Sequence, residues 1–233
     1  MKKRHMNKGH TQEGHNHHHD QADSQQSLLE YWEERYGESA QIWSGRVNQV
    51  LADVAGPLKQ DLSSFRALDL GCGEGGDAIW LAQNGWLTVG VDISSVATAR
   101  GNAKARELGL PTEILRLEAG DLLVWDTSDK FDLVTCSFLH SWPVPLPREE
   151  ILQRATRFVT PGGFLLITAH ASHPGHPELK FPTPPEDLSA LNLDPTRWET
   201  LLCELRERQG KMPDGSVATV TDSVVLVRFG AQN

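Results

Sequence analysis

The sequence is poor in cysteine and has no long apolar run. Its three cysteines, in 233 residues, form no C-x-x-C pair, so it shows neither a disulfide framework nor a cysteine zinc site. No stretch approaches the roughly 18 consecutive apolar residues that span a bilayer, and the basic start leads into polar sequence rather than the apolar core of a secretion signal. We therefore expect a soluble, cytoplasmic protein without a membrane partner.

Positive charge is also scarce. The chain carries 22 Lys and Arg against 31 Asp and Glu, a net charge of −9. Nucleic-acid binding depends on clustered positive charge, because neutralised phosphates supply most of the affinity. We therefore expect no nucleic-acid partner. With 39% hydrophobic and 23% charged residues, the composition is that of a globular protein, and the length suits one α/β domain.

Residues 1–26 differ from the rest of the chain. They hold six of the ten histidines and almost nothing apolar, so they cannot bury enough surface to fold alone. Residues 17–20, His-His-His-Asp, carry metal-ligand side chains but show no fixed ligand spacing. We expect a disordered His-rich tail and no metal site.

Helical and strand patterns then follow one another. Apolar residues at steps of three and four predict two helices within residues 27–62. In residues 63–233, Val- and Leu-rich strands alternate with helices, which is typical of a parallel sheet covered on both faces. The strands are expected at residues 67–70, 88–92, 112–117, 131–137 and 164–169, and the helices at 77–83, 94–108 and 148–158. Residues 198–206 and 217–229 flank a glycine-containing turn and predict a terminal antiparallel hairpin.

A glycine-rich turn joins the first strand to the helix after it. Glycines at 71 and 73 permit a tight turn and let a ligand approach the backbone, and the helix start offers free N–H groups. Asp92 closes the second strand, a position from which a carboxylate can accept hydrogen bonds from ribose hydroxyls. Asp69 would repel a pyrophosphate but attract the ammonium of a methionine moiety beside a sulfonium. The alternative is that Asp69 caps the loop and Asp92 caps the next helix.

The pattern D-x-G-x-G-x-G from Asp69 to Gly75, followed by Asp92, resembles the cofactor motif of the class I S-adenosylmethionine-dependent methyltransferases. The order of elements fits that family over residues 63–233. The resemblance implies a Rossmann-like, doubly wound α/β fold with a seven-stranded, mostly parallel sheet, a C-terminal antiparallel hairpin and helices on both faces. It also implies S-adenosyl-L-methionine as cofactor.

Further motifs add residues to the expected cofactor site. Residues 120–122, Gly-Asp-Leu, look like the family's adenine site, in which Asp121 would accept from the exocyclic amine and the Leu122 N–H would meet a ring nitrogen. Asp121 could instead be a simple turn residue. The resemblance also places in the cofactor site Cys72, Ile93, Ser137 and Trp43.

Histidines follow the fourth and fifth predicted strands. His140 lies where ligands bind at the carboxyl edge of such sheets and is the candidate general base, unless it only packs or caps. A base is optional in methyl transfer, because an acceptor that is already an anion needs none. His170, His173 and His176 are interpreted as part of an acceptor-side loop, since their run contains Pro and Gly and lacks a fourth metal ligand.

Residues 32–36 and 42–46 resemble the N-terminal region of the tellurite-resistance and thiopurine methyltransferases, a small-molecule group. In that group N-terminal helices cover the cofactor, so residues 27–62 are expected to form a helical lid. The resemblance assigns to the acceptor pocket Trp32, Arg35, Tyr36 and His170. The alternatives are core packing for the aromatic side chains and a solvated surface position for the arginine.

The expected function is transfer of a methyl group from S-adenosylmethionine to a small-molecule acceptor, giving S-adenosylhomocysteine. The end of the fourth strand lacks the Asn-Pro-Pro-Tyr or Asp-Pro-Pro-Tyr run that enzymes methylating nucleobase amines share. Two alternatives stay open: a nicotinamide-dependent oxidoreductase and a non-catalytic, metal- or ligand-responsive binding protein. The acceptor atom, whether S, O, N or a metalloid, and the choice between monomer and homodimer are also open.

Overall fold

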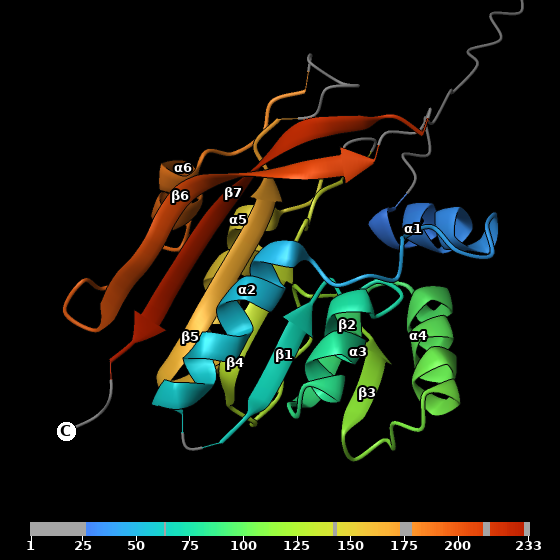
Figure 1. Cartoon of the computed structure of the whole chain (residues 1–233), viewed down its shortest axis with the longest axis horizontal. Coiled ribbons are helices and arrows are strands. Elements are labelled where there is room, and N and C mark those ends of the chain that lie inside the picture. The colour runs from blue at the N-terminus through green and yellow to red at the C-terminus, as the bar shows by residue number, and fades with distance from the viewer. Residues whose placement is uncertain (1–26, 63, 142–143, 173–178, 212–214, 231–233) are drawn as a thin grey trace, which may run out of the picture.

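The protein contains one seven-stranded sheet. The computed structural model describes residues 27–62, 64–141, 144–172, 179–211 and 215–230. The sheet order is β3-β2-β1-β4-β5-β7-β6, with β7 antiparallel to both of its neighbours and the other pairs parallel (Figure 1). The strands are β1 (Arg66–Leu70), β2 (Leu87–Asp92), β3 (Leu115–Ala119), β4 (Phe131–Ser137), β5 (Val159–His170), β6 (Trp198–Lys211) and β7 (Val217–Phe229).

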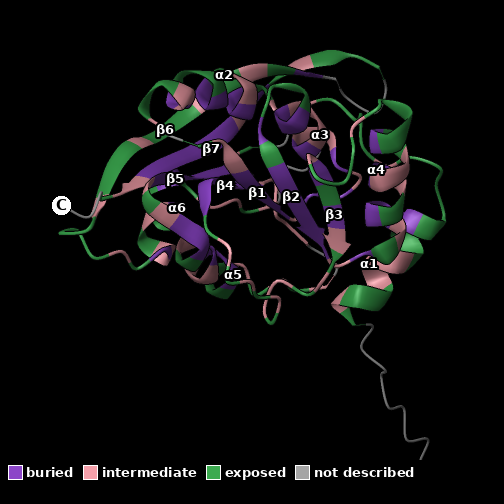
Figure 2. Ribbon diagram, turned by 90° about the horizontal axis from the view of Figure 1, so that it is seen from below, coloured by how far each residue is buried: buried purple, intermediate pink, exposed green. Residues whose placement is uncertain are grey.

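Helices cover both faces of this sheet, as Figure 2 shows. The α-helices are α1 (Leu28–Gly37), α2 (Gln49–Leu58), α3 (Gly76–Gln83), α4 (Ser95–Glu107), α5 (Arg148–Ala155) and α6 (Pro184–Ala190), and two short 3₁₀ turns occupy Lys59–Asp61 and Thr156–Phe158. The second, third and fourth helices pack on one face, and the fifth and sixth on the other. The predicted doubly wound α/β fold with its terminal hairpin is therefore confirmed.

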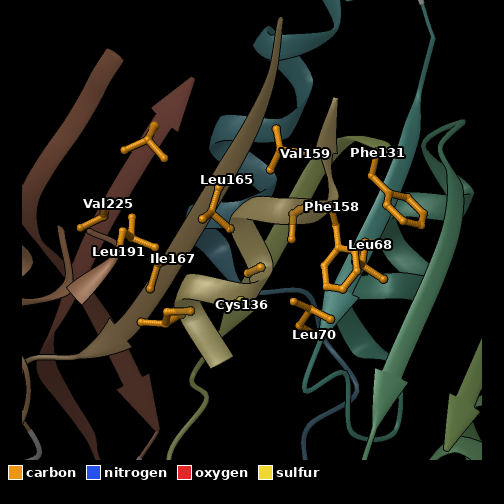
Figure 3. Packing of buried hydrophobic residues seen from close by; sticks show 14 of the residues in the cluster. Leu68, Leu70, Phe131, Cys136, Phe158, Val159, Leu165, Ile167, Leu191 and Val225 are labelled. Atoms are coloured by element: carbon orange, nitrogen blue, oxygen red, sulfur yellow. The ribbon is translucent and has the colours of Figure 1, made fainter. Parts of the chain in front are cut away.

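The hydrophobic core has two main layers because successive strand residues point to opposite faces. Ala67 packs with α2, whereas its neighbour Leu68 packs in the cluster under α5. Figure 3 shows the second layer, in which the Phe158 ring lies near Leu68, and Ile167 lies near Leu191. A sheet buried on both faces explains why its strands are continuous apolar runs in the sequence.

Several elements differ from the sequence prediction. The fifth strand begins at Val159 rather than at residue 164, and the last residues of the predicted helix 148–158 form a 3₁₀ turn. The third strand begins at Leu115 rather than at residue 112, because the backbone N–H groups of Ile114 and Leu115 bond to the carbonyl of Pro111 in a turn. Helix α6 was not predicted, and its first turn contains two prolines, Pro184 and Pro185. Thr183 caps this helix in a capping box with Glu186, and proline is favourable in a first helical turn.

The terminal hairpin is longer than predicted. Strand β6 ends at Lys211, not at residue 206. The β5–β7 pairing ends at His170 and Asp222, but the β6–β7 pairing continues to Lys211 and Val217. The end of the hairpin therefore projects past the carboxyl edge of β5, and Figure 1 shows it crossing above the parallel strands.

The N-terminal helices, predicted together as a lid, take different positions. Helix α1 lies beyond the carboxyl edge beside α4, whereas α2 packs on the sheet with Leu51 and Ala55 fully buried (Figure 1). Within the described residues, no helix is long and apolar enough to cross a membrane. The His-rich tail, His173 and His176 lie outside the described residues.

Truncation of the α2 core contact should destabilise the whole domain. Leu51→Ala leaves a cavity between α2 and the sheet, and we expect a loss of about 2–5 kcal/mol in the free energy of unfolding. Leu29→Ala, on half-exposed α1, should change it by less than about 0.5 kcal/mol. Urea denaturation of both variants measures the difference, and equal effects would contradict a core position for α2.

Candidate functional site

The glycine-rich turn between β1 and α3 exposes its backbone to a cleft. Gly71 and Gly73 have φ angles of +76° and +53°, a conformation that favours glycine. The Gly71 N–H donates to the carbonyl of Val91 at 2.8 Å, which ties the turn to the end of β2. A Cβ on Gly73 would lie 2.9 Å from the hydroxyl of Tyr36. A ligand in the cleft can therefore approach the backbone of this turn closely only because Gly71 and Gly73 carry no side chain.

Asp92 fixes the same turn from the next strand. Its carboxylate accepts hydrogen bonds from the N–H groups of Gly73 (2.8 Å) and Ser94 (2.9 Å). Burial raises its pKa, while these two N–H groups act to lower it. The N-cap of α4 is Ser94, whose hydroxyl accepts from the Ala97 N–H, so Asp92 supports the cap residue and is not the cap that its alternative interpretation made it. Each oxygen keeps lone-pair capacity toward the cleft, which Asp92 lines.

Two further carboxylates lie at the bottom of this region. Asp69 is only 2% exposed, and its Oδ2 is buried without a hydrogen-bond partner in the described part of the chain. Burial, and then the charges of Asp77 and Asp92, raise its pKa well above the usual value. Asp77 accepts from the Asn48 N–H at 2.6 Å, and burial raises its pKa as well. Among the described residues, no basic side chain forms an ion pair with any of the three. This end of the cleft therefore favours a cation.

Aromatic side chains of the N-terminal segment cover the glycine turn. The indole N–H of Trp43 donates to the Tyr36 hydroxyl at 2.8 Å, directly above Gly73. Glu74 accepts from the Trp43 N–H at 3.2 Å and pairs with Arg100 at 3.1 Å, which fastens the segment to the turn. Tyr36 is buried, but Trp43 stays 48% exposed. Core packing thus describes the tyrosine better than the tryptophan.

Glu33 attaches helix α1 to the same place. Its carboxylate accepts hydrogen bonds from the Ser95 N–H (2.7 Å), the Ser94 hydroxyl (3.0 Å) and the Val96 N–H (3.3 Å). It thereby satisfies free N–H groups at the start of α4. Although burial acts to raise its pKa, these hydrogen bonds hold the pKa below the usual value. Ser94 donates to both Glu33 and Asp92, so this cap formed by Glu33 connects α1 to Asp92 through one residue.

The other end of the cleft is aromatic. Phe138, with an unusual φ of +52°, stacks on His170 at 4.3 Å between ring centroids, and His170 in turn stacks on His140 at 5.8 Å. The backbone N–H of His170 donates to Nε2 of His140 at 3.2 Å. Burial, and then the charges of Arg148 and His170, lower the pKa of His140 to about 3. His140 is therefore neutral at neutral pH, with the Nε2 lone pair engaged by the backbone.

Asp121 lies at the rim rather than inside. Its carboxylate accepts from the Leu123 N–H at 2.9 Å and its carbonyl from the Trp125 N–H at 2.7 Å, as a turn residue would. It also lines the cleft beside Leu122. The turn interpretation and the adenine-site prediction are therefore compatible, and the role of Asp121 remains a prediction.

All the predicted site residues line one cleft of about 1660 Å³, more than a single small ligand needs. They are Trp32, Arg35, Tyr36, Trp43, Asp69, Gly71, Cys72, Gly73, Asp92, Ile93, Asp121, Leu122, Ser137, His140 and His170. The sequence analysis missed three further residues that line the cleft, Asp77, Arg208 and Phe181, the last of which lies edge-on to the rings of His140 and His170. It also missed Glu33, which does not line the cleft but holds α1 beside it. Asp77 carried a signal, an acidic residue at a helix start, but the other three reach the site only through long-range contacts.

Comparisons with known proteins agree with this geometry. Residues 67–163 match the family model described as a methyltransferase domain. The chain is 30% identical over 141 residues to "Probable thiol methyltransferase 2" of Arabidopsis thaliana, covering 58% of this chain and 59% of the relative. It is 31% identical over 108 residues to "Ubiquinone biosynthesis O-methyltransferase" of Paracidovorax citrulli, covering 46% and 44%. The chain thus spans about half the length of these curated relatives.

Solved structures show the same fold. One is described as "Conversion of a Disulfide Bond into a Thioacetal Group during Echinomycin Biosynthesis". It has a TM-score of 0.67 at 23% identity, and the match covers 88% of this chain and 94% of the chain in that structure. TehB from Haemophilus influenzae has a TM-score of 0.59 at 19% identity and covers 84% and 66%. These likenesses confirm the predicted Rossmann-like α/β fold, and the methyltransferase domain match covers residues 67–163 of it.

The Glu33 cap should contribute pH-dependent stability. Glu33→Gln removes the charge at the start of α4 and should lower the free energy of unfolding by about 1 kcal/mol at pH 7. A lowered folded-state pKa stabilises above the unfolded value of 4.5 and loses that effect as pH falls through the folded pKa. The difference between variant and wild type should therefore disappear under acid conditions in urea titrations from pH 7 to pH 3. Glu38→Gln, at the exposed end of α1, is the control, and an equal loss there would argue against the cap.

Proposed function

We propose that this chain, which carries the class I S-adenosylmethionine-dependent methyltransferase fold, transfers a methyl group from S-adenosyl-L-methionine to a small-molecule acceptor. The observation that carries the proposal is the buried, unpartnered Oδ2 of Asp69 among three carboxylates at the glycine turn. A nicotinamide dinucleotide would bring a pyrophosphate to this point, where these carboxylates repel it. The oxidoreductase alternative is therefore not favoured, and the matched methyltransferase domain argues equally against a purely non-catalytic binding protein.

The residues present fit the cofactor. Asp69 would accept from its ammonium group, Asp92 from its ribose hydroxyls, and Asp121 with the Leu122 N–H would meet its adenine. Trp43 and Tyr36 would shield the sulfonium from water and attract it through their ring faces. When bound, S-adenosylmethionine supplies an electrophilic methyl group and leaves as S-adenosylhomocysteine. Cys72, Ile93 and Ser137 would complete the walls of this part of the cleft.

The acceptor would enter at the aromatic end, between α1 and the terminal hairpin. Trp32, Arg35 and His170 line the cleft, and the protein's contribution would be alignment and exclusion of water. His140 was the predicted base, but its low pKa and engaged Nε2 make it a weak one. We propose instead that the acceptor brings its own negative charge, and a thiolate meets this requirement near neutral pH. The thiol methyltransferase relative supports the same acceptor class. The cytoplasmic location and the monomeric or homodimeric state remain proposals.

Asp69→Asn separates a binding role from a structural one. The raised pKa means that the ionised carboxylate costs stability as pH rises above 3.8, so the neutral amide should leave the apo protein equally or more stable at pH 7. Calorimetric titration should nevertheless show S-adenosylhomocysteine binding weakened by about tenfold or more. Gly109→Ala, a left-handed glycine in open space, is the control that should bind normally. Loss of stability with unchanged binding would assign Asp69 to the fold alone, and absence of binding to wild type would contradict the cofactor.

The role of His140 is tested by pH profiles. With a pKa of about 3, His140 stays neutral from pH 6 to pH 9, so kcat/KM for a simple thiol should rise with thiolate fraction and level off at the thiol's own pKa. His140→Gln should keep kcat within about fivefold, whereas loss of a true base costs roughly 100-fold or more. The measurement is methyl transfer to two thiols of different pKa. If kcat/KM for both thiols instead had the same midpoint near pH 6.5, and this midpoint disappeared in His140→Gln, His140 would be the general base.

A further inference from the structure

The projecting hairpin brings one arginine into the aromatic end of the cleft. Arg208 lies on β6 beyond the last β5–β7 pair, where the hairpin crosses above the parallel strands (Figure 1). Its side chain is 30% exposed and lines the cleft. The guanidinium lies over the ring of Phe138 at 5.4 Å, and so extends the row of stacked rings formed by Phe138, His170 and His140.

The orientation of this guanidinium is fixed by a buried carboxylate. Nε of Arg208 donates to Oδ2 of Asp222 at 2.5 Å, and Nη2 donates to Oδ1 at 3.3 Å. Asp222 is fully buried and does not itself line the cleft. An arginine has five N–H donors in a rigid fork, and Asp222 engages two of them. Three therefore remain, two on Nη1 and one on Nη2, without a hydrogen-bond partner in the described part of the chain.

The remaining donors form the end of the fork, which matches the two oxygens of a carboxylate. Within the described chain, Arg208 and the two histidines lie together around Phe138, whereas Asp69, Asp77 and Asp92 lie together at the glycine turn. The other charged side chains that line the cleft are Arg35, Arg46, Glu74 and Asp121. The aromatic part of the cleft thus carries an arginine, and the glycine turn carries the clustered carboxylates. Flat rings at the arginine end add a stacking surface for a planar molecule.

We propose that Arg208 is a specificity-determining residue that recognises a carboxylate on a flat acceptor. This proposal rests on the proposed function in one respect, the assignment of the acceptor to the aromatic end of the cleft. Asp222 acts as a positioning residue, because its two hydrogen bonds fix the orientation of the guanidinium that lines the cleft.

The test compares benzoate with benzamide, a neutral molecule of the same shape, by ligand-observed NMR titration with and without S-adenosylhomocysteine. Wild-type protein should bind benzoate about tenfold or more tightly than benzamide, and the ratio should shrink with added salt. Arg208→Gln should abolish the preference. Arg208→Lys keeps the positive charge but lacks the forked donors of arginine, so this variant should retain only part of the preference for benzoate. Arg206→Gln, on the same strand but paired with Glu204, is the matched control and should keep the preference.

Arg208→Gln leaves Asp222 buried and uncompensated, so it can also impair folding. The double variant Arg208→Gln with Asp222→Asn removes both charges and should fold, bind S-adenosylhomocysteine within about twofold of wild type, and show no preference for benzoate. Equal binding of benzoate and benzamide to wild type, or a preference that survives in the double variant, would overturn the proposal. A separate failure of S-adenosylhomocysteine to bind wild type would instead contradict the proposed function.

Discussion

Buried negative charge at the carboxyl edge of the sheet is the constraint around which the site is built. Asp69, Asp77 and Asp92 converge there from β1, α3 and β2, and no ion pair among the described residues compensates them. Burying carboxylates in this way costs stability unless a ligand supplies the positive charge. A cofactor with an ammonium and a sulfonium supplies two, so the arrangement that weakens the empty domain would strengthen the loaded one.

The N-terminal segment with α1 and the C-terminal β6–β7 hairpin border different parts of the cleft. At the acidic half, Glu33 on α1 accepts from backbone N–H groups at the start of α4, and Glu74 in the glycine turn accepts from the Trp43 N–H. The N-terminal cover is therefore attached beside Asp92. At the aromatic half, the long terminal hairpin carries Arg208 over Phe138. In the proposed reaction, the cationic donor and the anionic acceptor would each meet the half of opposite charge. The sheet holds both halves at a fixed separation.

The sequence predicted what depends on local patterns. The glycine turn, Asp69 and Asp92 could be recognised because a strand, a turn and a helix start lie in one continuous segment. Glu33 could not be recognised, since its partners begin 61 residues away and only the tertiary fold brings them together. Arg208 depended on how far the hairpin projects, which alternation alone does not specify. Helix α6 could not be recognised from the sequence, because prolines are common in linkers as well as in the first turn of a helix.

The most direct test of the account compares S-adenosylhomocysteine with 5′-methylthioadenosine in calorimetric titrations of the wild-type protein. Both contain the adenosine and the sulfur, but only the first carries the ammonium group that the buried carboxylates are proposed to hold. We predict binding of S-adenosylhomocysteine that is tighter by about 30-fold or more, because charge-assisted hydrogen bonds in a buried site are worth about 2 kcal/mol or more. Equal affinities would contradict the claim that the carboxylates at the glycine turn select a cationic cofactor.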